Sequence, residues 1–359
     1  MKQFLSKVII IFATVYAVII STNFVIDTAN LFHSDITDNM VTTLNAGHII
    51  ESPGNIDEGL FQEAMIKNLG HTPETIIIGS SHIMYEPWQF QDFYVAGLSG
   101  AYLGDYYAII GLLEETDHLP SHIIIGVDPW AFMTSASNGR HTSIAQYSQK
   151  EIKEISGEHA HLPDSSPLKD KIRKLKELVS LSYFHATITG VSKNGLKFYI
   201  NREIKAVDNV KEVTNTSIMP NGRYIMPRNK ELRKKDNDAA ANAAMQSNKI
   251  YQLGEGFSEL QADNIKEFEL LIQHLQKKGV TVEIYLHPWY PSVYAYFQSN
   301  KNYAGILKTE IYLRKFAQKH EIIVHGSYNP QLTNSTSEDF ADWFHLKPQK
   351  MLEAYNVIL

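Results

Sequence analysis

A serine at the end of an apolar strand is placed where covalent chemistry needs it. Residues 76–81 read Ile-Ile-Ile-Gly-Ser-Ser. A nucleophilic serine must be exposed at the end of a rigid element, near backbone N–H groups that stabilise the developing oxyanion. A strand that runs directly into a helix meets both needs, because a helix N-terminus carries unpaired N–H donors. The simpler alternative is that Ser80 or Ser81 only caps the next helix.

An aspartate and a histidine three residues apart lie near the far end of the chain. Residues 342–345 read Asp-Trp-Phe-His, just before a predicted terminal helix over 347–357. A carboxylate can orient an imidazole, which then removes a proton from a serine. An acidic turn beside a partly buried histidine is the simpler alternative. Taken together, the two motifs predict an acyl-transfer site with Ser81 as nucleophile, His345 as general base and then acid, and Asp342 as its orienting partner.

The elements that must position these motifs follow an α/β pattern. Apolar runs at 75–78, 93–98, 122–127, 280–286 and 322–325 predict buried strands, and helical spacing predicts helices between them. Buried strands separated by helices imply a parallel sheet with helices on its faces. Such sheets carry their sites at the carboxyl ends of the strands. We therefore expect Gly79, Gly100, Asp128, His287 and His345 to meet at one edge.

A polar stretch from about residue 133 to 256 interrupts the α/β pattern. It is not of low complexity, and it contains one clear amphipathic helix, in which leucines and an isoleucine recur between 168 and 181. We expect an α/β domain in two parts, 31–132 and 257–359, separated by an insertion or cap over 133–256. Residues 1–30 are expected to form a membrane anchor.

The anchor prediction depends on the first apolar run. Lys2 and Lys7 precede a mostly apolar run from Val8 to Ile26, and Asp27 ends it. Its length is close to the roughly 20 residues needed to cross a bilayer. Lysines before the run and an acid after it predict a cytoplasmic N-terminus and a domain on the outer side. An uncleaved anchor is favoured over a signal peptide, because a signal peptide has a shorter apolar core and a small-x-small cleavage site.

Composition excludes several chemistries. The chain has 359 residues, a net charge of −6 and no cysteine. Disulfides, zinc–thiolate sites, iron–sulfur clusters and a cysteine nucleophile are therefore excluded. Nothing in the global charge indicates nucleic acid. No phosphate-cradling loop or dinucleotide motif is present, and the predicted site needs no metal or other cofactor.

The two motifs together resemble those of the SGNH (GDSL-like) hydrolase superfamily, which has a three-layer αβα, flavodoxin-like fold. The family's first block reads Gly-Asp-Ser, and by that resemblance Ser81 aligns with the nucleophile and Ser80 stands at the aspartate position. The last block, Asp-x-x-His, matches Asp342 and His345. Residues 96–100, Ala-Gly-Leu-Ser-Gly, are similar to the second block, which implies an oxyanion hole made by the N–H groups of Ser81 and Gly100.

The third block departs from the family pattern. Gly-x-Asn-Asp is expected, whereas residues 126–129 read Gly-Val-Asp-Pro, so Asp128 stands at the asparagine position. An asparagine amide donates a hydrogen bond to the oxyanion, but an ionised carboxylate cannot donate and would repel it. Asp128 is therefore protonated in a desolvated site, or it has another role, or the oxyanion hole lacks its third donor. An aspartate that only closes a strand end is an equal alternative.

The layout resembles the membrane-anchored branch that contains DltD and the alginate O-acetylation proteins, over about residues 1–130 and 258–359. The resemblance implies an extracytoplasmic acyltransferase that works beside a membrane-bound O-acyltransferase and moves an acetyl or D-alanyl group to a cell-envelope polysaccharide or teichoic acid. The DltD signature His-Leu-Gly-Trp is replaced by His-Leu-Lys-Pro at 345–348, so D-alanylation is not favoured over acetylation. An SGNH esterase or deacetylase acting on envelope glycans, and a non-catalytic glycan-binding or scaffold protein, remain as alternatives.

Residues next to the predicted strand ends are weaker candidates for substrate contact: Ser80, Trp130, His287 and Trp289. Aromatic faces stack on sugar rings, but tryptophans more often serve as packing. For His287, a packed strand-end histidine is an equal alternative. The histidines at 141, 159 and 161 lack a further ligand at proper spacing, which favours a solvated loop over a metal site. The segment 202–235 holds nine Lys/Arg against four Asp/Glu, and is either a solvated face or a contact for an anionic polymer or lipid headgroups.

Overall fold

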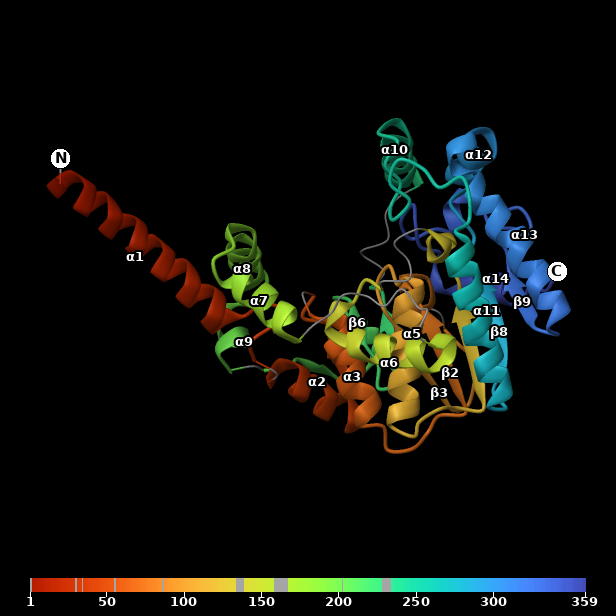
Figure 1. The fold of residues 1–359 in the computed structure, drawn as a ribbon, viewed down its shortest axis with the longest axis horizontal. Helices are drawn as coiled ribbons and strands as arrows, with labels where there is room; N and C mark the ends of the chain where they lie inside the picture. The colour runs from red at the N-terminus through yellow and green to blue at the C-terminus, as the bar shows by residue number, and fades with distance from the viewer. Residues whose placement is uncertain are drawn as a thin grey trace.

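A five-stranded parallel sheet forms the centre of the molecule (Figure 1). The structure is a computed structural model, and it describes residues 2–359 apart from 30, 34, 55, 86, 134–138, 158–166, 202 and 228–233. The strands lie in the order β3-β2-β4-β8-β9. Their bounds are β2 (Thr75–Gly79), β3 (Phe93–Gly97), β4 (His122–Gly126), β8 (Thr281–Leu286) and β9 (Ile323–Gly326). The α/β prediction and all five predicted strands are confirmed. The central strands are apolar throughout because both faces of the sheet are covered.

Crossover helices cover one face of this sheet. They are α5 (Leu103–Glu115), α11 (Ala262–Lys277) and α13 (Ala304–Lys319), which contact β2, β8 and β9 respectively. Each helix lies between two strands of the chain, and the second of these strands is always nearer the β9 edge of the sheet. Right-handed crossovers in the same direction place all three helices on the same face. The terminal helix α14 (Pro348–Tyr355) contacts β9. There the ring of Tyr355 stacks on His325 at 4.0 Å, and its hydroxyl donates to Glu283 at 3.0 Å.

The stretch 133–256 contacts the rest of the chain through several of its elements. Helix α6 (Ala145–Ser156) packs on α5 and α11. A small antiparallel sheet, ordered β5-β1-β6-β7, joins β1 (Ile49–Glu51) to strands from the inserted stretch. These strands are β5 (Ala206–Val207), β6 (Ser217–Ile218) and β7 (Tyr224–Ile225). The polar stretch therefore shares a sheet with the segment that precedes β2. Its last helix, α10 (Lys234–Gln246), contacts α12 (Pro291–Ser299).

The N-terminal helix α1 (Lys2–Ile26) projects away from the sheet domain (Figure 1). Its segment Gln3–Ile26 is long and apolar enough to cross a membrane. Among the described elements, α1 packs most closely on α7 (Pro167–Leu178), α8 (Leu181–Asn194) and α9 (Leu196–Asn201). The next two helices, α2 (Asp35–Asn45) and α3 (Glu58–Lys67), pack on each other and lead into the sheet.

Candidate functional site

The turn from β2 into the short helix α4 (Ser81–Met84) presents Ser81 at the carboxyl end of the sheet. Ser80 is the N-cap of α4, and its Oγ accepts the backbone N–H of His82 at 3.2 Å. Ser81 is the first residue of the helix and is only partly buried. A Cβ on Gly79 would lie 3.0 Å from the carbonyl oxygen of Gly126, so only glycine lets β2 and β4 approach this closely. Of the two hydroxyls, one therefore caps the helix and the other faces outward.

His345 and Asp342 lie in the loop before α14, and this loop reaches back to the start of α4. The Oγ of Ser81 lies 2.8 Å from Nε2 of His345. Nδ1 of the same ring lies 2.9 Å from Oδ2 of Asp342. Oδ1 of Asp342 accepts the backbone N–H groups of Phe344 at 2.8 Å and of His345 at 2.7 Å. The two predicted motifs, separated by more than 260 residues, thus meet in one hydrogen-bonded series.

The electrostatics of this series favour one arrangement of protons. Burial opposes ionisation of Asp342, but its hydrogen bonds with His345 and with two backbone N–H groups outweigh that effect and hold the pKa of the carboxyl below its usual range. An ionised Asp342 accepts the proton on Nδ1 of His345. Nε2 then faces Ser81 as a lone pair that can accept the hydroxyl proton. Both side chains keep some exposure, 19% for His345 and 33% for Asp342, so the series is open to solvent and to ligands.

Asp128 pairs with a buried histidine, His82. It follows β4, is 2% exposed, and its Oδ1 lies 2.6 Å from Nδ1 of His82. The interpretation of Asp128 as an oxyanion-hole donor is therefore wrong, because its carboxylate is turned into the interior as an acceptor for His82. The ring of His82 stacks on His287 at 4.1 Å and lies 5.6 Å from the ring of His345. Burial, followed by the neighbouring His82 and His345, lowers the pKa of His287 well below its usual value, which keeps that ring neutral.

The four residues predicted to contact substrate all lie in the interior. Their exposed fractions are 1% for Ser80, 0% for Trp130, 4% for His287 and 2% for Trp289. The prediction is wrong for this set, because side chains buried to this degree offer no surface to a substrate. They support the site from behind instead. Trp130 stacks on Phe344 with ring centroids 6.1 Å apart, and Trp289 meets the same ring edge-on at 5.3 Å, which fixes the residue next to His345.

Polar side chains that sequence reasoning missed converge on Gly100. This glycine has φ +62°, and a Cβ there would lie 2.5 Å from Nε2 of Gln252 and 2.9 Å from both Nη1 of Arg140 and the hydroxyl of Tyr251. The hydroxyl of Tyr102 donates to Oε1 of Gln252 at 2.8 Å, so the amide nitrogen faces the glycine. Gln252 has φ +63°, a strained conformation for a residue with a side chain. These side chains come from the polar stretch, where no sequence pattern singled them out.

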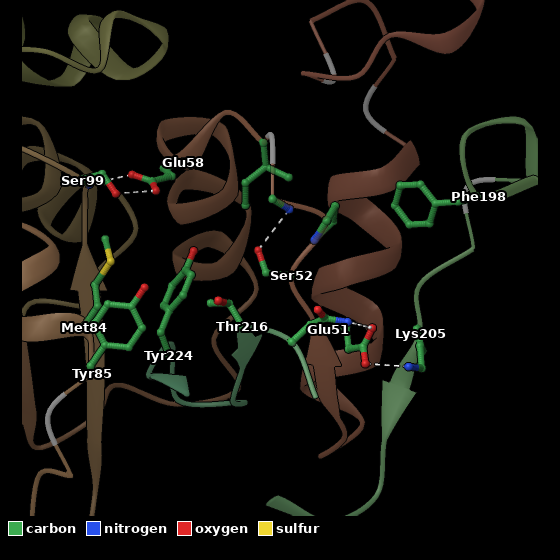
Figure 2. A pocket seen from close by; sticks show the side chains of 14 residues that line it. Glu51, Ser52, Glu58, Met84, Tyr85, Ser99, Phe198, Lys205, Thr216 and Tyr224 are labelled. Carbon is green, nitrogen blue, oxygen red and sulfur yellow. Dashed lines mark hydrogen bonds and ion pairs between the residues drawn. The ribbon is translucent and has the colours of Figure 1, made fainter. Parts of the chain in front are cut away.

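A pocket of about 450 Å³ lies beside the Ser81 series, between the large and small sheets (Figure 2). The aromatic ring of Tyr85 forms one wall and lies 5.9 Å from the ring of His345. Phe198 and Tyr224 add two further aromatic surfaces. Its charged groups are Glu51, Glu58 and Lys205, and Lys205 is paired with Glu51 at 2.5 Å.

Polar groups complete the pocket lining. Both oxygens of Glu58 accept hydrogen bonds from Ser99, at 2.6 Å from its N–H and 2.7 Å from its hydroxyl (Figure 2). Ser99 is the residue before Gly100, so this contact connects the pocket to the turn around which Gln252 and Arg140 gather. Ser52, Asn215 and Thr216 provide further hydrogen-bonding side chains.

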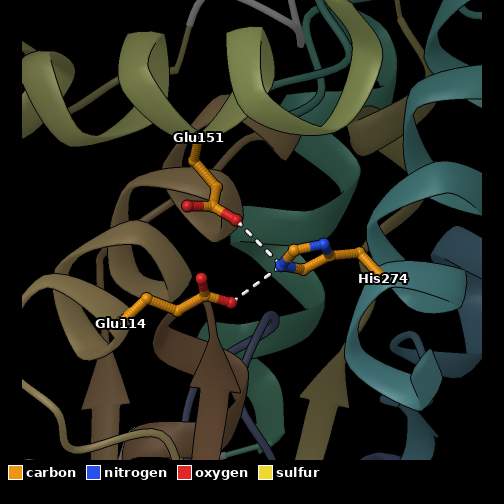
Figure 3. A group of neighbouring side chains, drawn as sticks. All are labelled: Glu114, Glu151 and His274. Atoms are coloured by element: carbon orange, nitrogen blue, oxygen red, sulfur yellow. Dashed lines mark hydrogen bonds and ion pairs between the residues drawn. The ribbon is translucent and has the colours of Figure 1, made fainter. Parts of the chain in front are cut away.

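A second titratable cluster lies away from this site, where α5, α6 and α11 meet. Glu114 and Glu151 both point at one ring nitrogen of His274, at 2.8 Å and 3.3 Å (Figure 3). Lys278 also pairs with Glu114. Burial, with the nearby charges of Glu114 and Glu154, raises the pKa of Glu151 to about 7. Lys278 already supplies a positive charge here, so the cluster reads as an interhelical ion-pair network that is sensitive to pH.

The remaining candidate sites from the sequence are spread over different parts of the chain. His141 lies 3.1 Å from the carbonyl oxygen of Ser99, beside the pocket. His159 and His161 lie outside the described residues, as does part of the basic segment 202–235. Within that segment, Lys205 belongs to the pocket. Comparison of the sequence with protein-family models and with curated proteins finds no match in either.

Proposed function

We propose that this chain is a membrane-anchored, serine-dependent acyltransferase of the SGNH type, acting on hydroxyl groups of a cell-envelope glycan. One observation carries the proposal: Ser81 Oγ lies 2.8 Å from His345 Nε2, with Asp342 on the opposite nitrogen of the ring. This is the order of contacts by which serine nucleophiles are activated on unrelated folds. Its place at the carboxyl edge of a parallel sheet and the apolar helix α1 agree with the predicted branch of that superfamily.

The first half-reaction forms an acyl-enzyme. Ser81 Oγ attacks the carbonyl carbon of the acyl donor while its proton passes to Nε2 of His345. Asp342 stabilises the imidazolium through Nδ1. When the tetrahedral intermediate collapses, the bond to the leaving group breaks and His345 returns the proton to it. In the second half-reaction an acceptor hydroxyl gives its proton to His345 and attacks the ester carbonyl. Collapse of the second tetrahedral intermediate breaks the bond to Ser81 Oγ, which takes the proton back from His345, and the acyl group stays on the acceptor.

The oxyanion hole in this proposal has a donor that replaces the missing asparagine. The backbone N–H groups of Ser81 and Gly100 are the first two donors. Gln252 Nε2 is directed at Gly100 by the bond from Tyr102, and an amide donor is the group that the asparagine would have supplied. The guanidinium of Arg140 is the other donor at this point. Fixed donors of this kind are aimed at charge that develops only in the transition state.

The pocket beside Tyr85 is the acceptor site in this proposal. Three aromatic walls and a lining of hydroxyl, amide and carboxylate groups suit a saccharide, which stacks its apolar face and hydrogen-bonds through its edge. Two glutamates against one lysine give the lining a net negative formal charge. A neutral or amine-bearing glycan therefore fits better than a teichoic acid, whose phosphates would be repelled.

Hydrolysis is the second candidate, because the same acyl-enzyme can react with water. The partial exposure of His345 and Asp342 allows water to reach the site. Product analysis with and without acceptor glycan separates the two reactions: transfer gives an acylated glycan, whereas hydrolysis gives free acid in both cases.

The proposal is tested by trapping the acyl-enzyme. A fluorophosphonate probe added to the full chain is expected to form one adduct, located at Ser81 by peptide mass spectrometry. Ser81→Ala should abolish labelling, and Ser299→Ala, which removes a hydroxyl at the end of α12, should not change it. A folded protein that gives no adduct at Ser81 would favour the non-catalytic alternative, a glycan-binding or scaffold protein.

A further inference from the structure

The helices α7, α8 and α9 carry an apolar surface beside α1 that the other residues described by the structure leave uncovered. On α7 lie Ile172 and Leu175, and Val179 directly follows its last residue; the three are spaced at three- and four-residue steps and are 45%, 52% and 47% exposed. They therefore form one stripe along the helix. The exposed apolar residues of the next two helices are Leu181, Ile188, Leu196 and Ile200.

The end of α1 is joined to these helices by buried polar contacts. Asn23 is fully buried, and its Nδ2 lies 3.0–3.3 Å from the carbonyl oxygens of Glu177, Leu178 and Ser180, at the end of α7. One side-chain amide thus supplies donors where a helix C-terminus leaves carbonyls without intrahelical partners. The carbonyls of Glu177 and Ser180 also accept the backbone N–H groups of Ser180 and Phe184. Such pairing of backbone groups matters most near the bilayer, because an unpaired carbonyl or N–H group is costly where no water can bind it.

Asp27 makes a second connection just beyond α1. Its carboxylate accepts the N–H groups of Leu31, Phe32 and His33, each at 2.8 Å, and the hydroxyl of Tyr183 on α8 at 2.9 Å. These bonds fix the direction in which the chain leaves α1. Together with the contacts of Asn23, they join α7 and α8 to the C-terminal end of α1, and α9 contacts both α1 and α8. Figure 1 shows the three helices grouped beside that end of α1.

The part of α1 on which α7–α9 pack indicates what covers the apolar stripe. The buried side chains of α1 begin at Ile19 and end at Ile26. At 1.5 Å per residue this contact extends about 10 Å along the helix axis. If the apolar run of α1 spans the bilayer, the helices packed on its last 10 Å reach the depth of the headgroup and acyl boundary, which is where interfacial amphipathic helices lie, about 5–10 Å deep.

The charge on α7 fits the same environment. Its twelve residues include five Lys/Arg and two Asp/Glu. Lys176 is exposed beside the stripe of Ile172, Leu175 and Val179. Lysines at the margin of an apolar stripe extend their ammonium groups toward lipid phosphates while their methylene chains stay in the apolar layer.

We infer that α7–α9 form a lobe that inserts its apolar stripe into the outer leaflet next to α1, so that the chain meets the membrane through a span and an interfacial surface together. The inference depends on the proposed anchoring of α1, but it does not depend on the proposed chemistry. A chain fixed at two places cannot pivot freely about a single helix, so the site would be held at a constant height and tilt above the bilayer.

Single cysteines test this inference directly, because the chain contains none of its own. The full chain carrying Leu175→Cys, Ile188→Cys, Phe12→Cys or Ile311→Cys is labelled with a small fluorophore. Each is then reconstituted alone in vesicles of phosphatidylcholine and phosphatidylglycerol. Ile311 is the matched control, since it is an apolar residue on α13 with 55% exposure, against 52% for Leu175 and 51% for Ile188. Phe12, in the middle of α1, reports on the span itself.

The readout is quenching by nitroxide lipids. A nitroxide near the headgroup should quench the labels at 175 and 188 about twofold or more above the label at 311, as their expected depth of 5–10 Å requires. A nitroxide deep in the acyl chains should act mainly on the label at 12. Quenching at 12 without stronger quenching at 175 and 188 than at 311 overturns the lobe inference but leaves the anchor intact. This result is expected if a protein partner covers the stripe. No quenching at 12, 175 or 188 overturns both.

Discussion

Replacing Asp342 by asparagine probes the protonation of His345 without dismantling its loop. Oδ1 of Asp342 is fixed by two backbone N–H donors, at 2.8 Å from Phe344 and 2.7 Å from His345. In Asp342→Asn the amide oxygen must take this acceptor position, because an NH₂ group there would face two donors. The amide nitrogen then occupies the Oδ2 position, 2.9 Å from Nδ1 of His345. A donor at that point requires Nδ1 to lose its proton, and the neutral ring then carries its proton on Nε2.

A ring protonated on Nε2 cannot accept the Ser81 proton. In enzymes with this triad, the same change costs about 10⁴ in kcat. At 1.36 kcal/mol per factor of ten, that is about 5.5 kcal/mol of transition-state stabilisation. The loss should appear in kcat rather than in KM, because Asp342 does not line the pocket beside Tyr85.

The assay is hydrolysis of a chromogenic acetyl ester, supported by the rate of fluorophosphonate labelling. Asp339→Asn is the matched control, since Asp339 lies three residues earlier and bonds Thr336 at 2.7 Å, away from His345. We expect the control to stay within about threefold of the parent and Asp342→Asn to lose about 10⁴. A loss below about tenfold, with the fold intact by circular dichroism, refutes the argument that Asp342 sets the tautomer.

Other substitutions test separate parts of the structure. Gln252→Met should lower kcat for the ester by about 10²-fold with little change in KM, because it removes an oxyanion donor but keeps side-chain length; an unchanged kcat would show that Arg140 or the backbone suffices. Gly100→Ala should lose more activity than Gly47→Ala, since both glycines have positive φ but only a Cβ at Gly100 meets site side chains; equal activities would mean that backbone strain alone matters. Glu151 has its pKa raised to about 7, so its ionisation destabilises the folded state as pH rises from about 4.5 to about 7. Glu151→Gln should therefore raise Tm only slightly at pH 5 and by a growing amount up to about pH 7. The exposed control Glu154→Gln should show no such growth. A rise in Tm that does not change with pH contradicts the view that ionisation of Glu151 destabilises the fold.

Much of the sheet domain could be predicted from the chain itself. An uninterrupted Thr-Ile-Ile-Ile-Gly or His-Ile-Ile-Ile-Gly is stable only where both faces of a strand are covered, which identifies β2 and β4 as central strands. The contact of Ser81 with His345 and Asp342 agrees with the sequence prediction, which followed because few residue types can activate a hydroxyl and because strand ends determine where such residues are exposed. The length and apolar composition of residues 8–26 were enough to predict a helix that could span a membrane.

The surroundings of the site were not predictable in the same way. Short strands such as β1 and β5 have too few residues for a periodic signal, so the small sheet and the pocket beside it could not be derived from spacing. The sequence left open whether Trp130, His287 and Trp289 contact substrate or pack in the core, because a strand-end position says which edge a residue occupies but not whether its side chain turns outward or inward.

The sequence determined which groups can react and roughly where each strand ends, because these follow from local composition. The tertiary structure decided which of them meet. It joined Ser81 to His345 across most of the chain, turned Asp128 inward onto His82, and brought Gln252 to Gly100. Contacts of this kind depend on the packing of distant segments into one core, and no local pattern encodes the distance between two side chains.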